Sequence, residues 1–105
     1  MMISTYVLDL GRGRPAARLA VELDFFITGH GWREVGHGVT SEEGRIYEFG
    51  ETPAAGVYRL MFDIGSYFPE PFFPSAIVTF EVRDVQQHNH VPLLLSPYGY
   101  STYRG

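Results

Sequence analysis

Short apolar runs separated by glycine and proline fill most of the chain, and the clearest of them repeat every second residue. Along Leu19–Phe25 each odd position is apolar, whereas Glu22 and Asp24 occupy even positions. The run 57–64 reverses the phase, with an aromatic or aliphatic residue at every even position and Arg59 at an odd one. Side chains of a strand point alternately to its two faces, so the pattern predicts strands with one buried face.

The pattern predicts eight strands, each short and bounded by turn residues. They are Ser4–Leu10, Leu19–Ile27, Trp32–Val39, Arg45–Phe49, Val57–Asp63, Ala76–Arg83, Asn89–Ser96 and Tyr98–Arg104. No twelve-residue segment carries the i, i+3, i+4 stripe of an amphipathic helix, and a short helical turn fits only at Ile64–Phe68. Twelve glycines and seven prolines punctuate the chain. We therefore expect an all-β sandwich or barrel, with residues 1–105 as one domain.

One C-terminal segment is too apolar for the surface of a single protomer. Residues 90–100, His-Val-Pro-Leu-Leu-Leu-Ser-Pro-Tyr-Gly-Tyr, carry no formal charge. A strand that is apolar on both faces has to be covered on both faces. It is either a central core strand or a strand covered by another subunit. The second explanation is favoured because the segment is C-terminal and contains two prolines.

Composition narrows the class of function. The chain has no cysteine, which excludes disulfides and thiolate metal sites and fits the reducing cytoplasm. Its formal net charge of -4 and its scattered basic residues argue against a nucleic-acid partner. No apolar run reaches the roughly 20 residues that span a bilayer. We expect a cytoplasmic protein that does not contact a membrane.

The last fifteen residues resemble a known family signature. Residues 91–105, Val-Pro-Leu-Leu-Leu-Ser-Pro-Tyr-Gly-Tyr-Ser-Thr-Tyr-Arg-Gly, are very similar to the C-terminal signature of the 5-hydroxyisourate hydrolases. Further matches lie along the chain at Ser4-Thr5, Val7-Leu8-Asp9, Gly13-Arg14-Pro15-Ala16-Ala17, Gly31-Trp32-Arg33, Gly38-Val39-Thr40, Gly44-Arg45, Tyr58-Arg59-Leu60 and Phe62-Asp63. The resemblance covers nearly the whole sequence, and it points to the 5-hydroxyisourate hydrolase branch of the transthyretin-like family.

The resemblance implies a fold, an assembly and a reaction. The expected fold is a transthyretin-like sandwich of two four-stranded sheets with at most one short helix. The expected assembly is a homotetramer whose active sites lie in a cleft where subunits meet. The expected reaction belongs to urate degradation in purine metabolism. In it, 5-hydroxyisourate, the product of urate oxidation, is hydrolysed at an acyl–nitrogen bond without a cofactor.

Two residues match the family's catalytic positions. His90 directly precedes the Val-Pro-Leu-Leu-Leu run, and its imidazole could take a proton from water or give one to a leaving nitrogen. Arg45 follows Gly44, and its guanidinium could fork onto a planar urate-like ring and a developing oxyanion. Taken alone, His90 could equally begin a strand and bond the backbone. Arg45 could equally be a solvated charge after a turn.

Other positions of the family site are kept in part. Tyr6 stands where the family has histidine, and a phenol can donate a hydrogen bond but holds its proton too firmly to be a good general base. Ser101, Tyr103 and Arg104 match the family ending and are expected to line the substrate cleft. The family signature continues Tyr-Arg-Gly-Ser, whereas this sequence stops at Gly105, which would change how the cleft is capped.

His88 and His90 form a second, weaker motif. Residues two apart on a strand face the same way, so the two imidazoles could hold a metal ion such as zinc. No third ligand is evident in the sequence, and we expect no metal site. Histidines 30 and 37 flank glycines and carry no motif of their own.

Three functions therefore compete. The leading hypothesis is a cofactor-free hydrolase of 5-hydroxyisourate, in which Arg45 orients the substrate, His90 moves protons and Tyr6 donates a hydrogen bond. The second is a transthyretin-like protein that binds a small aromatic ligand without turning it over. The third is a related hydrolase of a different cyclic amide. The motivation for both alternatives is Tyr6.

Overall fold

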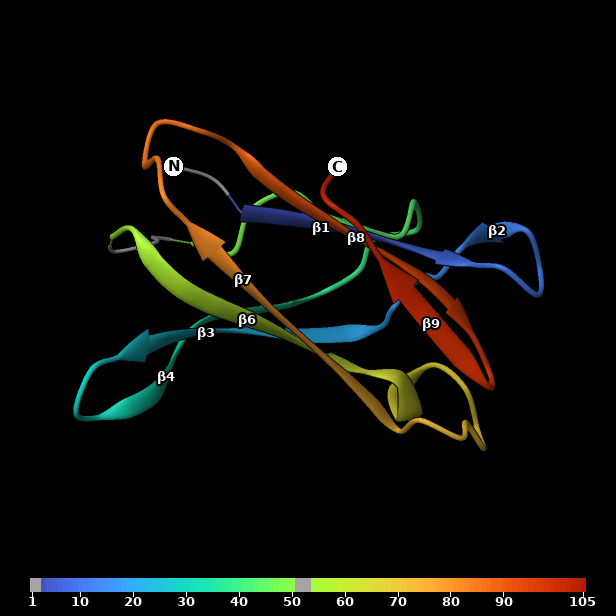
Figure 1. The fold of residues 1–105 in the computed structure, drawn as a ribbon. Helices are drawn as coiled ribbons and strands as arrows, with labels where there is room; N and C mark the ends of the chain where they lie inside the picture. The colour runs from blue at the N-terminus through green and yellow to red at the C-terminus, as the bar shows by residue number, and fades with distance from the viewer. Residues whose placement is uncertain (1–2, 51–53) are drawn as a thin grey trace.

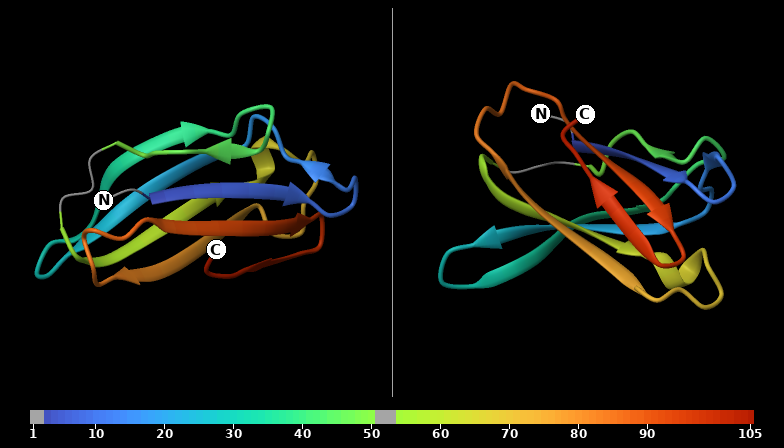
Figure 2. Two further views of the ribbon diagram at one scale, coloured as in Figure 1. Left: turned by 90° about the horizontal axis from the view of Figure 1, so that it is seen from above. Right: turned by 45° about the vertical axis from the view of Figure 1, so that its right-hand side comes forward.

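The computed structural model describes residues 3–50 and 54–105, which form two packed β-sheets (Figures 1 and 2). The first sheet contains β1 (Ile3–Asp9), β2 (Arg14–Pro15), β5 (Arg45–Ile46), β8 (Asn89–Ser96) and β9 (Gly99–Thr102). The second contains β3 (Ala20–Ile27), β4 (Gly31–Val39), β6 (Gly56–Asp63) and β7 (Ser75–Val82). A single 3-10 turn, η1 (Ile64–Ser66), follows β6 at the predicted place. No described helix is long and apolar enough to cross a membrane.

The sheet orders are β2-β1-β8-β9, with β5 also paired to β1, and β4-β3-β6-β7. Most neighbours are antiparallel, but β1 and β8 run parallel although they come from opposite ends of the sequence. Figures 1 and 2 show the two strands side by side, β1 at the blue end of the colour range and β8 towards the red end. This parallel pair brings the two terminal sequence signatures together.

The predicted sandwich is confirmed, with one correction to its strand count. The first sheet has five strands because Arg14 and Pro15 pair with Asp9 and Leu8 at its edge. Proline has no N–H to donate, and an edge strand tolerates that loss. The predicted strand Arg45–Phe49 is also too long: pairing stops at Ile46, and the chain leaves the sheet so that Phe49 enters the core.

The core lies between the inner faces of the two sheets. The run 57–64 behaves as predicted, with its even-numbered residues fully or almost fully buried. In the first sheet the inner residues of β8, Val91, Leu93 and Leu95, face this core. Because β8 lies between β1 and β9, the uncharged segment is a central strand of its own sheet. The protomer's own core therefore covers the inner face of this strand, and covering of its outer face by another subunit stays a prediction.

Asp24 departs from the predicted alternation, because it is only 2% exposed although it belongs to the polar face of β3. The cause is Arg59 of β6, whose Nε donates to Asp24 Oδ2 at 2.8 Å and whose guanidinium lies 4.3 Å from the Trp32 ring centre. The other carboxylate oxygen, Oδ1, is buried without a hydrogen-bond donor among the described residues. The neighbouring Glu22 has a pKa raised to about 7, mainly by a side-chain hydrogen bond with Asp24 and then by burial and the Asp24 charge.

A tight turn places β5 against β1. Gly44 N–H donates to Ser41 C=O, and Val7 N–H donates to Gly44 C=O, both at 2.8 Å. Gly44 has φ +73°, and a Cβ there would lie 2.6 Å from the Val7 carbonyl oxygen. Only glycine fits both the left-handed conformation and this close approach. The next residue, Arg45, is positioned by this contact.

Gly44→Ala should destabilise the protein more than Gly13→Ala. Both glycines have a positive φ, but a Cβ at Gly13 meets nothing within 4 Å. The control variant should lower the free energy of unfolding by about 1–2 kcal/mol, the ordinary penalty of the left-handed region. Gly44→Ala should add the cost of pushing β5 away from β1. Urea unfolding of both variants measures the difference, and equal losses would show that the close approach is unimportant.

Glu22→Gln should flatten the dependence of stability on pH. A carboxyl whose pKa is raised from 4.5 to about 7 stabilises the folded state most below pH 4.5, and this contribution is lost as pH rises through 7. Glutamine keeps the neutral, hydrogen-bonding form at every pH. Unfolding midpoints measured from pH 4.5 to 8.5 should therefore fall in the parent but less in the variant. Glu70→Gln, in an exposed loop, controls for the change in net charge; parallel curves for parent and Glu22→Gln would contradict this assignment.

Candidate functional site

The candidate site lies on the outer face of the first sheet. Alternation along β1 sends Thr5 and Val7 into the core and leaves Ser4 and Tyr6 on the opposite face. In the strand registers, Ser4 pairs with His90 of β8, and Tyr6 pairs with Arg45 of β5. Three strands far apart in sequence therefore bring both predicted catalytic residues and Tyr6 to one surface.

Arg45 and Tyr6 are in direct contact. The guanidinium carbon lies 4.6 Å from the centre of the Tyr6 ring, which is a cation–π geometry. The contact fixes the guanidinium above β1 and leaves its planar N–H groups to meet a planar acceptor. Arg45 is half-buried, so its charge is less screened than that of a free surface residue. A charged fork therefore stands beside Tyr6.

His90 is held at one nitrogen and is kept neutral by its surroundings. Its Nδ1 lies 2.8 Å from Ser4 Oγ, which leaves Nε2 as the nitrogen that can meet a substrate. Burial lowers the pKa of His90 below 6.5, and the charges of Arg45 and His88 lower it further. A neutral imidazole at pH 7 can accept a proton from water, which is what a general base requires.

The chain end covers the edge of this imidazole. Gly105 N–H donates to the His90 carbonyl oxygen at 2.9 Å, and a Cβ on Gly105 would lie 2.6 Å from His90 Cδ2. Upstream, Ser101 pairs with Leu94, whose side chain alternates with the core residues of β8. Ser101 therefore shares the outer face with the candidate site. The terminal segment therefore lies beside His90, and its part in substrate binding stays a prediction.

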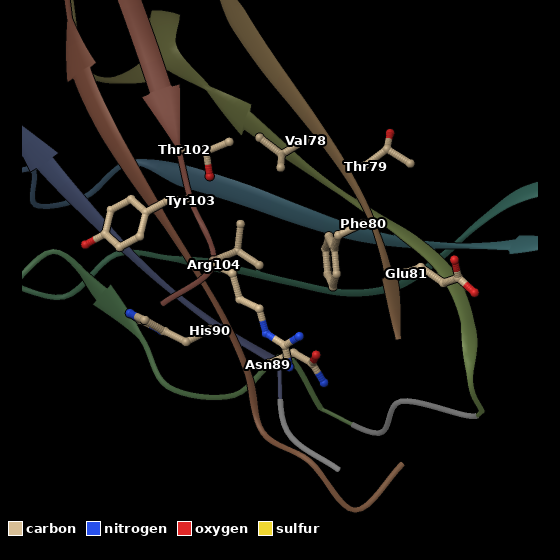
Figure 3. A pocket seen from close by; sticks show the side chains of 10 residues that line it. Val78, Thr79, Phe80, Glu81, Asn89, His90, Thr102, Tyr103 and Arg104 are labelled. Atoms are coloured by element: carbon tan, nitrogen blue, oxygen red, sulfur yellow. The ribbon is translucent and has the colours of Figure 1, made fainter. Parts of the chain in front are cut away.

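Arg104 and Tyr103 line the same hollow, although their side chains extend in different directions. Figure 3 shows the Tyr103 ring and the His90 imidazole on one side of the strands, whereas Arg104 extends the other way towards Asn89. A hollow of about 260 Å³ lies there between β7 and the end of the chain. Its lining residues are Val78, Thr79, Phe80, Glu81, Asn89, His90, Val91, Thr102, Tyr103 and Arg104. Neither Arg45 nor Tyr6 lines this hollow within one protomer.

Sequence reasoning missed Ser4 as a member of the site. Its hydroxyl is 2.8 Å from His90 Nδ1 and also 2.7 Å from His88 Nε2, and the residue is only 4% exposed. The shared contact confirms that His88 and His90 face the same way. The side chain that joins the two histidines is a serine. No group of three or more metal-ligating side chains occurs in the described parts of the chain.

The sequence is similar to that of a known family and of several of its members. Residues 3–105 match the model of the HIUase/Transthyretin family. The chain is 41% identical over 110 residues to a 5-hydroxyisourate hydrolase of Salmonella dublin, covering 99% of this chain and 80% of the relative. It is also 40% identical over 118 residues to an Arabidopsis thaliana uric acid degradation bifunctional protein, TTL, but spans only 36% of that protein's length.

Solved structures extend the likeness to the fold. The structure of Klebsiella pneumoniae 5-hydroxyisourate hydrolase superposes with a TM-score of 0.86 at 35% identity, covering 99% of this chain and 97% of that one. Sea bream transthyretin, in complex with thyroxine, superposes with a TM-score of 0.93 at 30% identity, covering 100% and 95% of the two chains. With a family match over almost its entire length and relatives at about 40% identity, this chain belongs to the HIUase/Transthyretin family.

Proposed function

We propose that this protein hydrolyses 5-hydroxyisourate, opening one ring at an acyl–nitrogen bond. The observation that carries the proposal is the convergence of Arg45 and His90 on one face, where the arginine's charge helps to keep the imidazole neutral. The relatives named as 5-hydroxyisourate hydrolases support the choice of substrate. The reaction would serve urate degradation and would need no cofactor.

Each residue has a distinct part in the proposed reaction. Nε2 of His90 accepts a proton from the attacking water and returns one to the leaving nitrogen, so that hydrolysis consumes no net proton. The fork of Arg45 holds the planar substrate and stabilises the oxyanion that forms as water adds to the carbonyl carbon. The phenol of Tyr6 lies under that fork and donates a hydrogen bond to substrate or water.

We also propose that the working form is a cytoplasmic homotetramer in which another subunit closes the site. Tyr6 and Arg45 lie on the outer face of a sheet, and the hollow that His90 and Tyr103 line within one protomer does not include them. A ring-opening reaction gains from the exclusion of bulk water, because electrostatic stabilisation is stronger in a dry site. A second copy of the chain over this face would supply that enclosure. Ser101 and Tyr103 would then border the bound substrate.

A binding protein without turnover is the second candidate function. The resemblance puts histidine where this chain has Tyr6, and the sea bream relative is a transthyretin solved in complex with thyroxine. A related hydrolase of another cyclic amide would fit the same observations. Both alternatives make Tyr6 the residue that decides between turnover and binding.

Arg45→Lys and His90→Gln should each remove most of the activity. Lysine keeps the charge but loses the planar fork, so kcat/KM should fall about 100-fold, as for the loss of one oxyanion donor. Glutamine cannot exchange a proton, and kcat should fall by about 100- to 10,000-fold. Arg33→Lys, on the exposed face of β4, is the matched control and should keep parental activity. Spectroscopic decay of freshly generated 5-hydroxyisourate is the measurement, and full activity of either site variant would overturn the mechanism.

Tyr6→Phe and Tyr6→His separate the three functions. Phenylalanine keeps the ring beneath Arg45 and removes only the hydroxyl, so kcat/KM should fall about tenfold, the equivalent of one hydrogen bond. Histidine at this position should match or exceed the parental rate. A parent that binds urate-like compounds without hydrolysing them, together with an active Tyr6→His, would favour the binding protein. Unchanged activity in Tyr6→Phe would exclude a role for the phenol.

A further inference from the structure

The hydroxyl of Ser4 joins the candidate site to a second histidine that the proposed reaction does not use. Ser4 Oγ lies 2.8 Å from His90 Nδ1 and 2.7 Å from His88 Nε2, and the centres of the two rings are 6.3 Å apart. Ser4 is 4% exposed, whereas His88 is exposed. A continuous line of hydrogen-bonding atoms therefore runs from the imidazole of the site to the protein surface.

The protons on His88, Ser4 and His90 can be arranged in two ways. A hydroxyl has one proton, so Ser4 can donate to only one of the two rings while it accepts from the other. In the first state His88 Nε2–H donates to Ser4, Ser4 donates to His90 Nδ1, and His90 carries its own proton on Nε2. In the second state His90 Nδ1–H donates to Ser4, Ser4 donates to His88 Nε2, and His90 Nε2 has a free lone pair. The first state has an acid facing the substrate, and the second has a base.

We propose that Ser4 and His88 form a proton relay that switches His90 between its acid and its base form and exchanges its proton with solvent. The relay deepens the proposed hydrolysis and rests on it. When His90 Nε2 takes a proton from water, the Nδ1 proton moves to Ser4, the Ser4 proton moves to His88 Nε2, and His88 Nδ1 releases one to solvent. When His90 Nε2 then gives its proton to the leaving nitrogen, the same transfers run in reverse, with His88 Nδ1 taking a proton from solvent, and they restore the base form. One proton enters at one end and one leaves at the other, so no bond or charge is left unbalanced.

The relay would spare the site a positively charged His90, which burial and the charge of Arg45 disfavour. Ser4 of β1 contacts His90 Nδ1, and the charges of Arg45 from β5 and of His88, just before β8, act on the His90 ring. A protonated His90 would place a positive charge beside Arg45, and burial already disfavours that charge. Passing a proton on through Ser4 avoids an imidazolium at this position. His88, at the surface, can release the proton to water.

Ser4 itself is poorly placed to be a nucleophile. Its hydroxyl is covered by both imidazoles and by its buried position in β1, so a substrate carbonyl carbon cannot reach it. Among the described side chains, no third metal ligand joins the two histidines. The remaining chemistry for a serine between two imidazoles is proton transfer.

Ser4→Ala and His88→Gln test the relay in the intact protein. Each should lower kcat by about tenfold or more with little change in KM, because proton exchange and not substrate binding is impaired. Added imidazole should restore kcat in His88→Gln, where the gap is at the surface. It should not restore Ser4→Ala, where the gap is buried, whereas Ser4→Thr should retain a relay. His30→Gln, an exposed histidine in the turn between β3 and β4, should behave as the parent. A His88→Gln variant with parental kcat, or with a loss that imidazole does not rescue, would overturn the proposal.

Nitrogen NMR of the histidine rings gives a readout that does not depend on turnover. With a working relay, His90 should exchange between its two tautomers in the parent and shift towards one of them in Ser4→Ala and in His88→Gln. Identical His90 ring signals in all three proteins would contradict the relay even if 5-hydroxyisourate is hydrolysed. Conversely, a parent that does not accelerate 5-hydroxyisourate decay would contradict the proposed function. The NMR comparison would still decide whether protons pass through Ser4.

Discussion

The parallel pairing of β1 with β8 is the constraint on which the rest of the site depends. Through it, Ser4 lies opposite His90, and Thr5 Oγ1 donates to the Val91 carbonyl oxygen at 2.6 Å, across 86 residues of sequence. Such a pair has a high loop-closure cost and has to be stabilised by the core beneath it. The apolar inner side chains of β8, buried in the core, supply this stabilisation. The apolar terminal signature therefore builds the sheet, and His90 occupies the outer face that the sheet presents.

A second short pairing completes the site. β5 contributes only two residues, yet the register of Tyr6 with Arg45 brings a permanent positive charge within reach of the His90 imidazole. The charge has opposite effects on two groups: it attracts a planar, electron-rich substrate and it disfavours the protonated form of His90. One arginine can thus serve both substrate binding and the availability of the base. The position of Arg45 depends on the close approach of the Gly44 and Val7 backbones, which a side chain at position 44 would prevent.

Sequence patterning was sufficient for most of the fold because the strands have clear polar and apolar faces. It failed where tertiary contacts override local pattern: Arg14–Pro15 joins a sheet edge, and Asp24 is buried by Arg59. The resemblance directed attention to Arg45, His90 and Tyr6, which the structure places close together. It included Ser4-Thr5 but gave Ser4 no role, because the contact of Ser4 with His90 follows only from the register of β1 with β8. It also suggested one cleft for Arg104 and the others; within one protomer Arg104, Tyr103 and His90 line one hollow, which Tyr6 and Arg45 do not line.

The most direct test of the proposed hydrolysis is to follow the decay of 5-hydroxyisourate, freshly generated from urate, with and without the unsubstituted protein. We expect ring opening well above the spontaneous rate, saturating with substrate and requiring no added metal or cofactor. Decay at the spontaneous rate at every protein concentration would contradict the assignment of Arg45 and His90 as a working hydrolytic pair.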